Sequence, residues 1–414
     1  MNEFTVVFLA ALLAGICIQW LLCRRHILHV RKHRAAVPAS FSDRIPLAAH
    51  QKAADYTQAR VRLGMLELVI SMMLLLIWTL GGVLQLLDNA WRSMPLSGLW
   101  TGAAVILSFL GISAILDLPL SWYRTFKLEQ RFGFNKSTLK IFFSDFAKNM
   151  LLGFLIGAPI ILLVLWIMEH AGAFWWFYVW LTWLIFSVSM IAIYPTFIAP
   201  LFNKFRPLEN QELKQRIENL LRRNGFASKG IFVMDGSTRS THGNAYFTGL
   251  GANKRIVFFD TLINELSPEE IEAVLAHELG HFKCNHIRKR MMTLGLVFFA
   301  GLALLGWLIK MPWFYQGLGI AQPSAYIALL LFGIIAPVFA FFLQPVFSWI
   351  SRQHEFEADD FAAAQAQTGN LIQALVKLYR ENANTLTPDP LYSAFHDSHP
   401  PAPIRIAHLN AKLT

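Results

Sequence analysis

The sequence predicts an all-α polytopic membrane protein that crosses the bilayer seven times and carries a smaller α+β segment outside it. Composition is the first indication: 55% of the 414 residues are hydrophobic and 15% are charged, and the mean hydropathy is +0.44. A soluble domain has about 25% charged residues. The second indication is the spacing of apolar stretches that are long enough to span a bilayer. They are residues 4–23, 65–87, 98–116, 150–168, 174–198, 292–311 and 324–350.

The first apolar stretch is expected to remain part of the folded protein. A cleaved signal peptide carries basic residues before its apolar core, whereas here Glu3 precedes the stretch and Arg24-Arg25 follow it. The chain has three isolated cysteines, which give no disulfide framework. Cysteine usage of this kind is typical of a reducing compartment.

The distribution of basic residues predicts the orientation in the membrane. Residues 24–62 and 117–148 are rich in lysine and arginine, whereas residues 169–173 and 312–323 contain neither. Because basic loops stay in the cytoplasm, the N-terminus is expected outside the cell. The net charge of +10 follows largely from these loops, and no array of basic and aromatic residues indicates a nucleic-acid partner. The short outer loops favour a bacterial inner membrane.

This pattern divides the chain into four parts. They are a membrane region with five spans (1–198), a soluble segment (199–290), spans six and seven (291–350) and a tail (351–414). The soluble segment and the tail are expected on the cytoplasmic side, together with the two basic loops.

The soluble segment mixes helix and strand patterns. Residues 208–223 have the periodicity of an amphipathic helix, and residues 231–234 and 255–259 are typical of short strands. The edge of such a sheet can bind an extended peptide by backbone pairing. Asn244, between the two strands, is then either a clamp for that peptide or an ordinary turn residue beside glycines.

Residues 277–281, His277-Glu278-Leu279-Gly280-His281, are the most informative part of the sequence. Histidines four residues apart project from one face of a helix, so both can bind one tetrahedral metal ion. The glutamate between them can take a proton from a water molecule beside the metal. The alternative is a surface helix with two solvated histidines.

The helix that carries this motif is well specified, because Ser267 and Glu270 have the spacing of a capping box. Zinc proteases with three histidines need glycine and histidine at the positions that Cys284 and Ile287 occupy here. His286 is one residue away from the required position. The third ligand must therefore come from another part of the chain.

The charged segment 351–362 offers a carboxylate for this purpose. Glu355 and Asp359 are four residues apart and share one helical face, whereas Glu357 is rotated by about 200° from Glu355. Glu355 is therefore the predicted third ligand. Asp359 is expected to accept the free N–H of a metal-bound histidine. The alternatives are a solvated charged face, or His354 and Glu357 as ligands.

Both ligand segments lie close to predicted spans. His281 is at most about 15 Å from the span that starts at 292 if the intervening residues are helical. Glu355 is about 8 Å beyond the end of the last span. The metal is therefore expected at, or just inside, the cytoplasmic boundary of the bilayer.

The sequence resembles a known family, the integral-membrane type I CAAX prenyl proteases, which are seven-span zinc metalloendopeptidases. The segments that carry the resemblance are residues 123–126, 133–136, 193–202, 244–247, 254–257, 277–281, 355–359 and 398–401. The resemblance implies a helical barrel around a chamber, capped by a cytoplasmic α+β zinc domain. It also implies a bacterial member of the family.

The resemblance assigns expected roles to residues of this chain. It implies that one zinc ion is bound by His277, His281 and Glu355, with Glu278 as the catalytic base and Asp359 in support. It implies that His399 lies at the active site, where it could stabilise an oxyanion. The expected substrate contacts are Asn244, Ala245, Tyr246 and Arg405.

The predicted function is hydrolysis of peptide bonds in peptides or membrane-associated proteins at the cytoplasmic membrane boundary. One alternative is a membrane quality-control protease of the heat-shock type, but that family has four spans rather than seven. Another is a transporter or scaffold with structural zinc. Structural zinc is normally bound by four protein ligands. The sequence offers three ligands and a glutamate base, which favours a catalytic zinc.

Overall fold

The computed structural model describes residues 2–226, 230–248 and 255–412. Lys254, which belongs to one of the segments that resemble the family, lies outside these residues. Seven helices in the described part of the chain are long and apolar enough to cross a membrane, as predicted. They are α1 (Glu3–Lys32), α2 (Leu47–Trp78), Gly98–Phe132, α6 (Leu139–His170), Gly172–Phe202, α12 (His286–Leu308) and Ala325–Gln365.

Three of these spans are built from several helical pieces. The first comprises α4 (Gly98–Tyr123), the π-helical turn η2 (Arg124–Glu129) and α5 (Gln130–Phe132). The next comprises η3 (Gly172–Phe174), α7 (Trp175–Ile193), the π-helical turn η4 (Tyr194–Ile198) and α8 (Ala199–Phe202). The last comprises α14 (Ala325–Ala340), η7 (Phe341–Leu343) and α15 (Gln344–Gln365).

The second span ends earlier than the apolar stretch 65–87 predicts. Helix α2 stops at Trp78, and Gly82 has a φ of 76°, a conformation that favours glycine. A short helix, α3 (Val83–Arg92), then packs on α4, and its buried Asp88 accepts a hydrogen bond from Tyr326 of α14 (2.7 Å). The apolar residues after Trp78 therefore belong to a turn and a separate helix.

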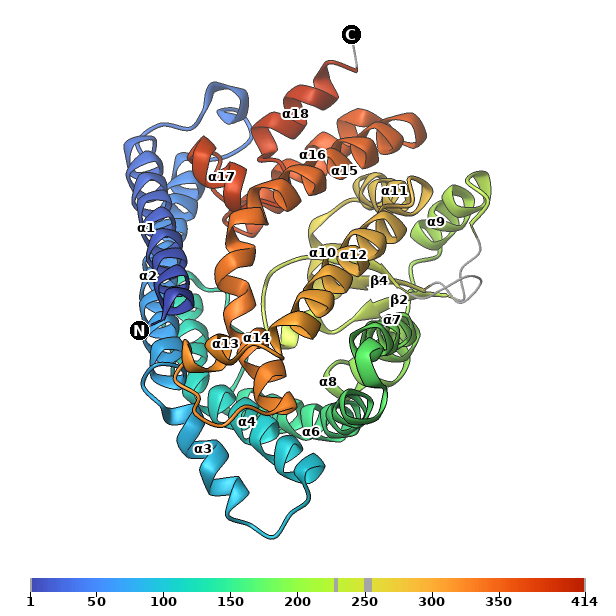
Figure 1. Ribbon diagram of the computed structural model, residues 1–414. Coiled ribbons are helices and arrows are strands. Elements are labelled where there is room, and N and C mark those ends of the chain that lie inside the picture. Colours follow the sequence, from blue (N-terminus) through green and yellow to red (C-terminus); the bar gives the residue numbers. More distant parts are fainter. Residues whose placement is uncertain (1, 227–229, 249–254, 413–414) are drawn as a thin grey trace.

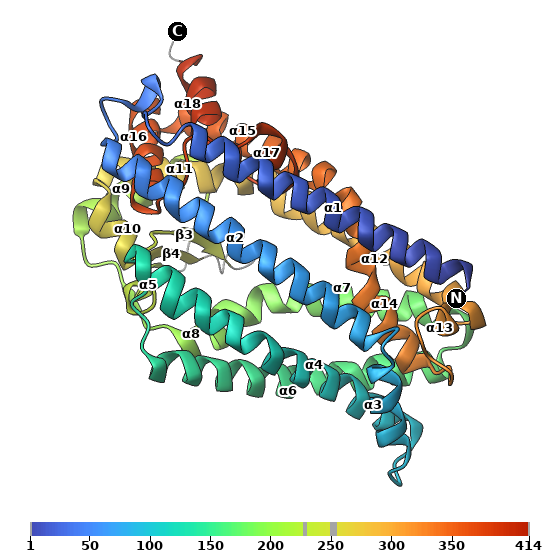
Figure 2. The ribbon, with the colours of Figure 1, turned by 90° about the vertical axis from the view of Figure 1, so that its left-hand side faces the viewer.

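The long helices form a ring when the molecule is viewed along them (Figure 1). In the view at 90° they run side by side (Figure 2). The N-terminus, α3 and α13 (Pro312–Gln316) lie at one end, and the C-terminus lies at the other, with the sheet and the helices around it. One apolar cluster joins the helices near the N-terminal end, with Phe8, Phe109 and Ile327 among its members.

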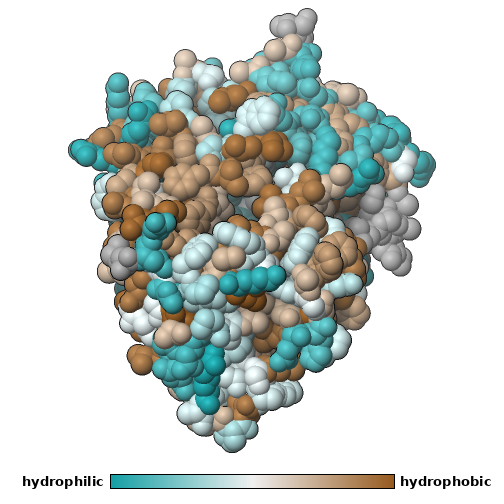
Figure 3. All heavy atoms as spheres, in the orientation of Figure 1, coloured by the Kyte–Doolittle hydropathy of each residue, from teal (hydrophilic) through white to brown (hydrophobic). Residues whose placement is uncertain are grey.

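The surface reflects the division between the membrane-spanning helices and the soluble part of the protein. In Figure 3, teal hydrophilic atoms gather over α16 (Thr368–Glu381) and α18 (Ala402–Asn410), and brown hydrophobic atoms spread over the helices on the left. Large apolar side chains stay exposed along the spans, for example Leu155 (57%) and Leu296 (68%). Such exposure suits helices that face lipid.

The soluble part contains a four-stranded sheet with the order β1-β2-β4-β3. The strands are β1 (Phe205–Pro207), β2 (Ile231–Met234), β3 (Ala245–Thr248) and β4 (Arg255–Phe259). Strands β2 and β4 are parallel, with Ile231 opposite Ile256. The two predicted strands are thus confirmed, and both are central, whereas β1 and β3 were not predicted. Strand β3 pairs antiparallel with β4 alone among the described residues, so it forms an edge.

Helices cover this sheet and enclose a second apolar core. They include α9 (Gln211–Arg223), α10 (Asp260–Glu265), α11 (Pro268–Lys283), α16 and α18. Helix α17 (Pro390–His396) packs instead on α1 and α15. Helix α9 confirms the amphipathic pattern at 208–223, although it begins three residues later, where the Asn210 side chain caps it. Short 3₁₀ turns occur at η1 (Ala39–Phe41) and η5 (Gly236–Thr238).

The two ligand segments differ in how they join the membrane helices. Helix α15 continues from α14. Helix α11 does not continue into the sixth span: it ends at Lys283, and Asn285 takes a left-handed conformation (φ 58°) before α12 begins. Asparagine tolerates this conformation better than most residues, and the turn places His286 beside the end of α11.

Candidate metal centre

Helix α11 is fixed at its start as the sequence predicts. The Ser267 side chain accepts a hydrogen bond from the Glu270 backbone N–H, and the Glu270 carboxylate accepts one from the Ser267 N–H (2.7 Å), which completes the capping box. Lys377 of α16 also donates to Glu270 (2.7 Å). Ile271, Leu275 and Leu279 are buried in the core. The helix therefore cannot rotate, and its histidines have a fixed direction.

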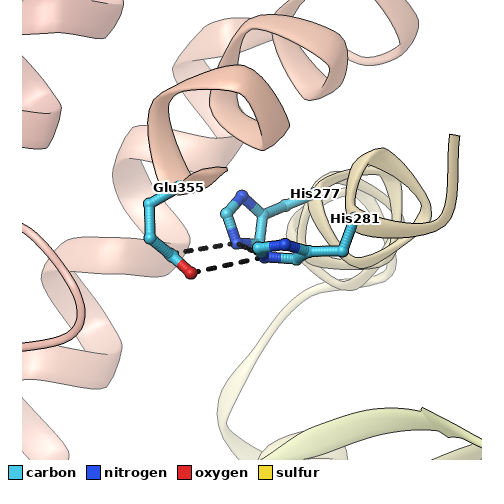
Figure 4. Close-up of side chains that lie close together, drawn as sticks. All are labelled: His277, His281 and Glu355. Carbon is cyan, nitrogen blue, oxygen red and sulfur yellow. Dashed lines mark hydrogen bonds and ion pairs between the residues drawn. The ribbon is translucent and has the colours of Figure 1, made fainter. Parts of the chain in front are cut away.

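Donor groups of three residues converge between α11 and α15 (Figure 4). The Nε2 atoms of His277 and His281 are 3.3 Å apart. The Glu355 carboxylate oxygens lie 3.5 Å from His277 Nε2 and 3.4 Å from His281 Nε2. Tetrahedral zinc with ligands at about 2.0–2.1 Å requires about 3.3–3.4 Å between donor atoms. The three residues thus fit one zinc ion.

The surroundings of these atoms also suit a cation. Glu355 is 3% exposed, and its Oε2 is buried without a well-directed hydrogen bond. Burial and Arg405 favour neutral His277, but the carboxylates of Asp359 and Glu355 outweigh both and raise the pKa of His277 to about 9. The site therefore attracts positive charge, which a metal ion would supply in place of a proton.

Glu278 lies on α11 between the two histidines. Its side chain is half-buried, and within the described ranges no hydrogen bond or ion pair engages its carboxylate. A group that accepts and returns protons needs such freedom.

Behind the ligands, Asp359 and Arg405 form a buried pair. Asp359 Oδ1 lies 2.9 Å from His277 Nδ1, the nitrogen that faces away from Glu355. Arg405 Nε donates to Asp359 Oδ2 (2.8 Å), and Arg405 Nη1 lies 3.6 Å from Glu355 Oε2. Asp359 is fully buried, and Arg405 is 7% exposed. Because the guanidinium is occupied by carboxylates, this geometry does not support the expected substrate contact of Arg405 and favours a role behind the ligands.

His399 lies on the other side of Glu355, in the loop between α17 and α18. Its Nδ1 is 2.8 Å from Glu355 Oε2, and 65% of its side chain is exposed. It lines a cavity of about 510 Å³ together with Arg60 of α2 and Tyr379 of α16. The structure thus brings this distant histidine to the candidate metal centre, at its open side.

The segment at Asn244 leads into edge strand β3. The Asn244 side chain is exposed, and its Oδ1 accepts a hydrogen bond from the Ala245 N–H (2.8 Å). It lines a cavity of about 930 Å³ that extends to Glu67 in α2 and Glu129 in η2. The Ala245 side chain is buried in the core, so only its backbone is available to a substrate.

Tyr246 points to the opposite face of the strand. It lines a separate pocket with Pro195 and Pro200, and burial, with Tyr194 nearby, raises its pKa to about 12. The geometry therefore supports a substrate contact through the strand backbone and Asn244 rather than through the Tyr246 side chain.

The sequence did not indicate the group of side chains beside His281. His281 Nδ1 lies 2.9 Å from His286 Nδ1, and His286 Nε2 lies 2.9 Å from Glu357 Oε2. The spacing of His286 does not suit a third ligand, and the structure agrees, since Glu355 meets the two motif histidines. The spacing alone could not show that the turn at Asn285 brings His286 back to His281.

The sequence also gave no direct sign of the cavity wall near Asn244. Tyr56 donates a hydrogen bond to Glu129 (2.7 Å), and His242 stacks on Phe134 (4.5 Å between ring centroids). A backbone bridge joins Asn135 to Ser240 and so ties residues 133–136 to the segment before Asn244. The available signal in the sequence was the segment 133–136, which is one of those that carry the family resemblance.

Comparisons with known proteins agree with this architecture. A family model described as the five membrane helices of the CAAX prenyl protease N-terminal region matches residues 26–204. The model of peptidase family M48 matches residues 207–413. Together they cover most of the chain.

Individual proteins match over similar lengths. CAAX prenyl protease 1 of Saccharomyces cerevisiae is 40% identical over 324 residues, which cover 73% of this chain and 72% of the relative. The Caenorhabditis elegans homolog is 34% identical over 414 residues, or 92% of each chain. The crystal structure of S. mikatae Ste24p superposes with a TM-score of 0.93 at 32% identity, over 99% of this chain and 100% of that chain.

Proposed function

Since this chain belongs to the M48 family of CAAX prenyl proteases, which are integral-membrane zinc metalloendopeptidases, we propose that His277, His281 and Glu355 bind its single zinc ion. The observation that carries this proposal is the convergence of their donor atoms: the two histidine Nε2 atoms are 3.3 Å apart, and each lies 3.4 or 3.5 Å from one carboxylate oxygen of Glu355. A fourth protein ligand is not needed, because a catalytic zinc keeps one position for water or substrate. The seven spans and the family matches leave the heat-shock-type and structural-zinc alternatives without support.

When bound by these residues, zinc would supply Lewis-acid polarisation of a peptide carbonyl and would lower the pKa of water. Glu278 then acts as the base: it takes a proton from the attacking water and returns it to the leaving amine. His399, 2.8 Å from Glu355 and open to solvent, can donate a hydrogen bond to the oxyanion that develops on the carbonyl. Asp359 holds His277 in the tautomer that offers Nε2 to the metal, and Arg405 holds Asp359 in place.

The substrate is proposed to bind as an extended strand. Edge strand β3 has an unpaired side within the described residues, and an extended peptide can add to such an edge through backbone hydrogen bonds. Asn244 would hold the peptide where it passes into the cavity of about 930 Å³. A folded protein presents no such strand, so unfolded or flexible segments are the expected substrates.

The relatives are named for CAAX prenyl substrates. A groove of about 570 Å³ between α7 and α12 suits such a substrate, because it is lined by apolar residues and reaches His281. Leu184, Met291 and Met292 are among its walls. We therefore include prenylated C-terminal peptides among the proposed substrates.

The orientation proposed from the basic loops places the zinc ion on the cytoplasmic side and the N-terminus outside. The arrangement of the termini at opposite ends of the helices supports this proposal (Figure 2). The divisions at 198, 290 and 350 remain proposed boundaries. A bacterial inner membrane is the proposed location.

The test is to measure zinc content and hydrolysis on the purified full-length protein in detergent. We expect one zinc ion per chain, loss of hydrolysis of a prenylated peptide after chelation, and recovery on adding zinc. Matched peptides without the prenyl group show whether the apolar groove contributes. Hydrolysis that survives removal of the metal would exclude the proposed chemistry.

A further inference from the structure

His281 makes a contact on the side away from the other ligands. Its Nε2 faces His277 and Glu355, and its Nδ1 lies 2.9 Å from His286 Nδ1. His286 is 4% exposed, and its other nitrogen, Nε2, lies 2.9 Å from Glu357 Oε2. Lys289 Nζ donates to the same carboxylate oxygen (3.1 Å).

The protons of these groups have one consistent arrangement. If His281 offers the lone pair of Nε2 to a metal, its Nδ1 must carry the hydrogen. His286 Nδ1 then has to be the acceptor, so the His286 proton sits on Nε2 and is donated to Glu357. Each group donates one hydrogen bond to the next, and the chain ends on the Glu357 carboxylate, which also accepts a hydrogen bond from Lys289.

The ring of His286 is held in the orientation that this arrangement requires. His354 of α15 stacks on it, with centroids 4.2 Å apart and an interplanar angle of 14°. The left-handed Asn285 turns the chain so that His286, at the start of α12, faces back to α11. The turn at Asn285 therefore both separates α11 from α12 and brings His286 into contact with His281.

We propose that His286 and Glu357 are positioning residues, which fix the tautomer and ring orientation of His281 for the metal. Each metal-binding histidine then has its own carboxylate from α15: Asp359 contacts His277 directly, and Glu357 acts on His281 through His286. This proposal rests on the proposed function, because it requires His281 to bind zinc. A carboxylate or other acceptor behind a metal-bound histidine commonly contributes about 10–100-fold in metal affinity.

A second metal site is the main competing interpretation of these residues. Donor atoms of Cys284, His286 and Glu357 all lie within 4.8 Å of one another. In the proposed arrangement both nitrogens of His286 are used in hydrogen bonds, and the Lys289 ammonium binds the same Glu357 oxygen that His286 contacts. The two interpretations predict different numbers of zinc ions per chain.

The test measures zinc affinity by competition with a chromophoric chelator, on full-length protein in detergent. His286→Phe keeps the ring stacked on His354 but removes both hydrogen bonds, and it should weaken zinc binding by about 10–100-fold. His354→Phe, the matched control, preserves the stack and the hydrogen bonds and should bind as the wild type does. His286→Asn can still accept from His281 through Oδ1, so it should recover part of the affinity.

Two further readouts separate positioning from general stability. Glu357→Gln should weaken zinc binding by less than His286→Phe does, and the double variant should be no weaker than His286→Phe, because both act through one path. The visible absorption of the Co²⁺-loaded protein should change in His286→Phe and stay unchanged in His354→Phe. If His286→Phe does not fold, the zinc affinity and spectra of His286→Asn and Glu357→Gln are compared with those of His354→Phe instead.

Equal zinc affinity and equal spectra in the His286 and His354 variants would overturn the proposal. So would two zinc ions per wild-type chain with one lost in both His286→Phe and Cys284→Ser, since that result indicates the second metal site. A wild-type protein without zinc, or one that keeps zinc after Glu355→Ala, would instead contradict the proposed function.

Discussion

Gly280 and Ala358 hold the backbones of α11 and α15 in direct contact. A Cβ atom on Gly280 would lie 2.8 Å from Ala358 Cα and 3.0 Å from its carbonyl oxygen. Both neighbouring atoms belong to the backbone and cannot move alone. The distance between His281 and Glu355, and hence the size of the metal site, therefore depends on the absence of a side chain at position 280.

We expect Gly280→Ala to lose tight zinc binding. The added methyl group must push α15 away, at a cost of about 1–3 kcal/mol for overpacking, and the donor atoms would move apart with it. Zinc content after dialysis measures the effect. Gly295→Ala in α12 is the control, because a Cβ there meets nothing within 4 Å and should leave zinc bound. Normal zinc content in Gly280→Ala would show that the helix contact does not set the site.

Glu278→Gln should keep zinc and lose activity. Glu278 is not among the three donor residues, so the metal stays bound, but the amide cannot accept the proton, and the rate should fall by at least about 10²–10⁴-fold. Zinc content and peptide hydrolysis are measured on the same preparation. Glu272→Gln, on the same helix but paired with Arg223 at the surface, should remain active. Substantial hydrolysis by Glu278→Gln would assign the base to another residue.

Glu355→Ala should release zinc at a chelator concentration that the wild type resists. Asp359→Ala should give a smaller loss, about 10–100-fold in affinity, because Asp359 supports His277 rather than binding the metal. Asp360→Ala, one residue further along α15 and paired with His408 and Lys412, should bind normally. A larger effect from Asp360 than from Asp359 would mean that the face of α15 is assigned incorrectly.

His399→Ala should lower kcat without releasing zinc. The side chain is mostly exposed, so its removal should cost little stability, whereas loss of an oxyanion donor typically costs about 10²–10³-fold in kcat. His408→Ala on α18 is the comparison, since His408 contacts Asp360 and none of the three donor residues. A change confined to KM in His399→Ala would indicate substrate binding instead.

The proposed orientation can be tested with a membrane-impermeant thiol reagent on intact cells. Lys140→Cys, at the start of α6, should be protected, and Gln322→Cys, between α13 and α14, should be labelled; both positions are exposed. The native cysteines are replaced by serine first. Cys284 is a poor probe because burial raises the pKa of its thiol. Labelling of Lys140→Cys from outside would show that the orientation is the reverse of the one proposed.

Features that depend on local periodicity are the ones that the sequence predicts best. The spans, α9, α11 and the shared face of Glu355 and Asp359 all depend on spacing within one helix, and the structure contains each of them. The length of an apolar stretch predicts the ends of a helix less exactly. It could not reveal that α2 stops at Trp78, because the residues beyond Trp78 are apolar too.

Contacts between distant segments could not be predicted in this way. Arg405 and Asp359 meet across 46 positions of the chain, and no periodicity relates α18 to α15. The role of His286 depends on a single left-handed residue, Asn285, whose sequence neighbours also suit a continuous helix.

The order of the donor residues along the chain has a consequence for biosynthesis. His277 and His281 are translated before α12 and α14, and Glu355 is translated after them. A ribosome-bound chain therefore has only two of the three donors until its last membrane helices have emerged. His399 and Arg405 emerge later still. If the metal binds as proposed, we expect no hydrolysis by the nascent chain during insertion, and hydrolytic capacity only when the finished chain closes around the metal.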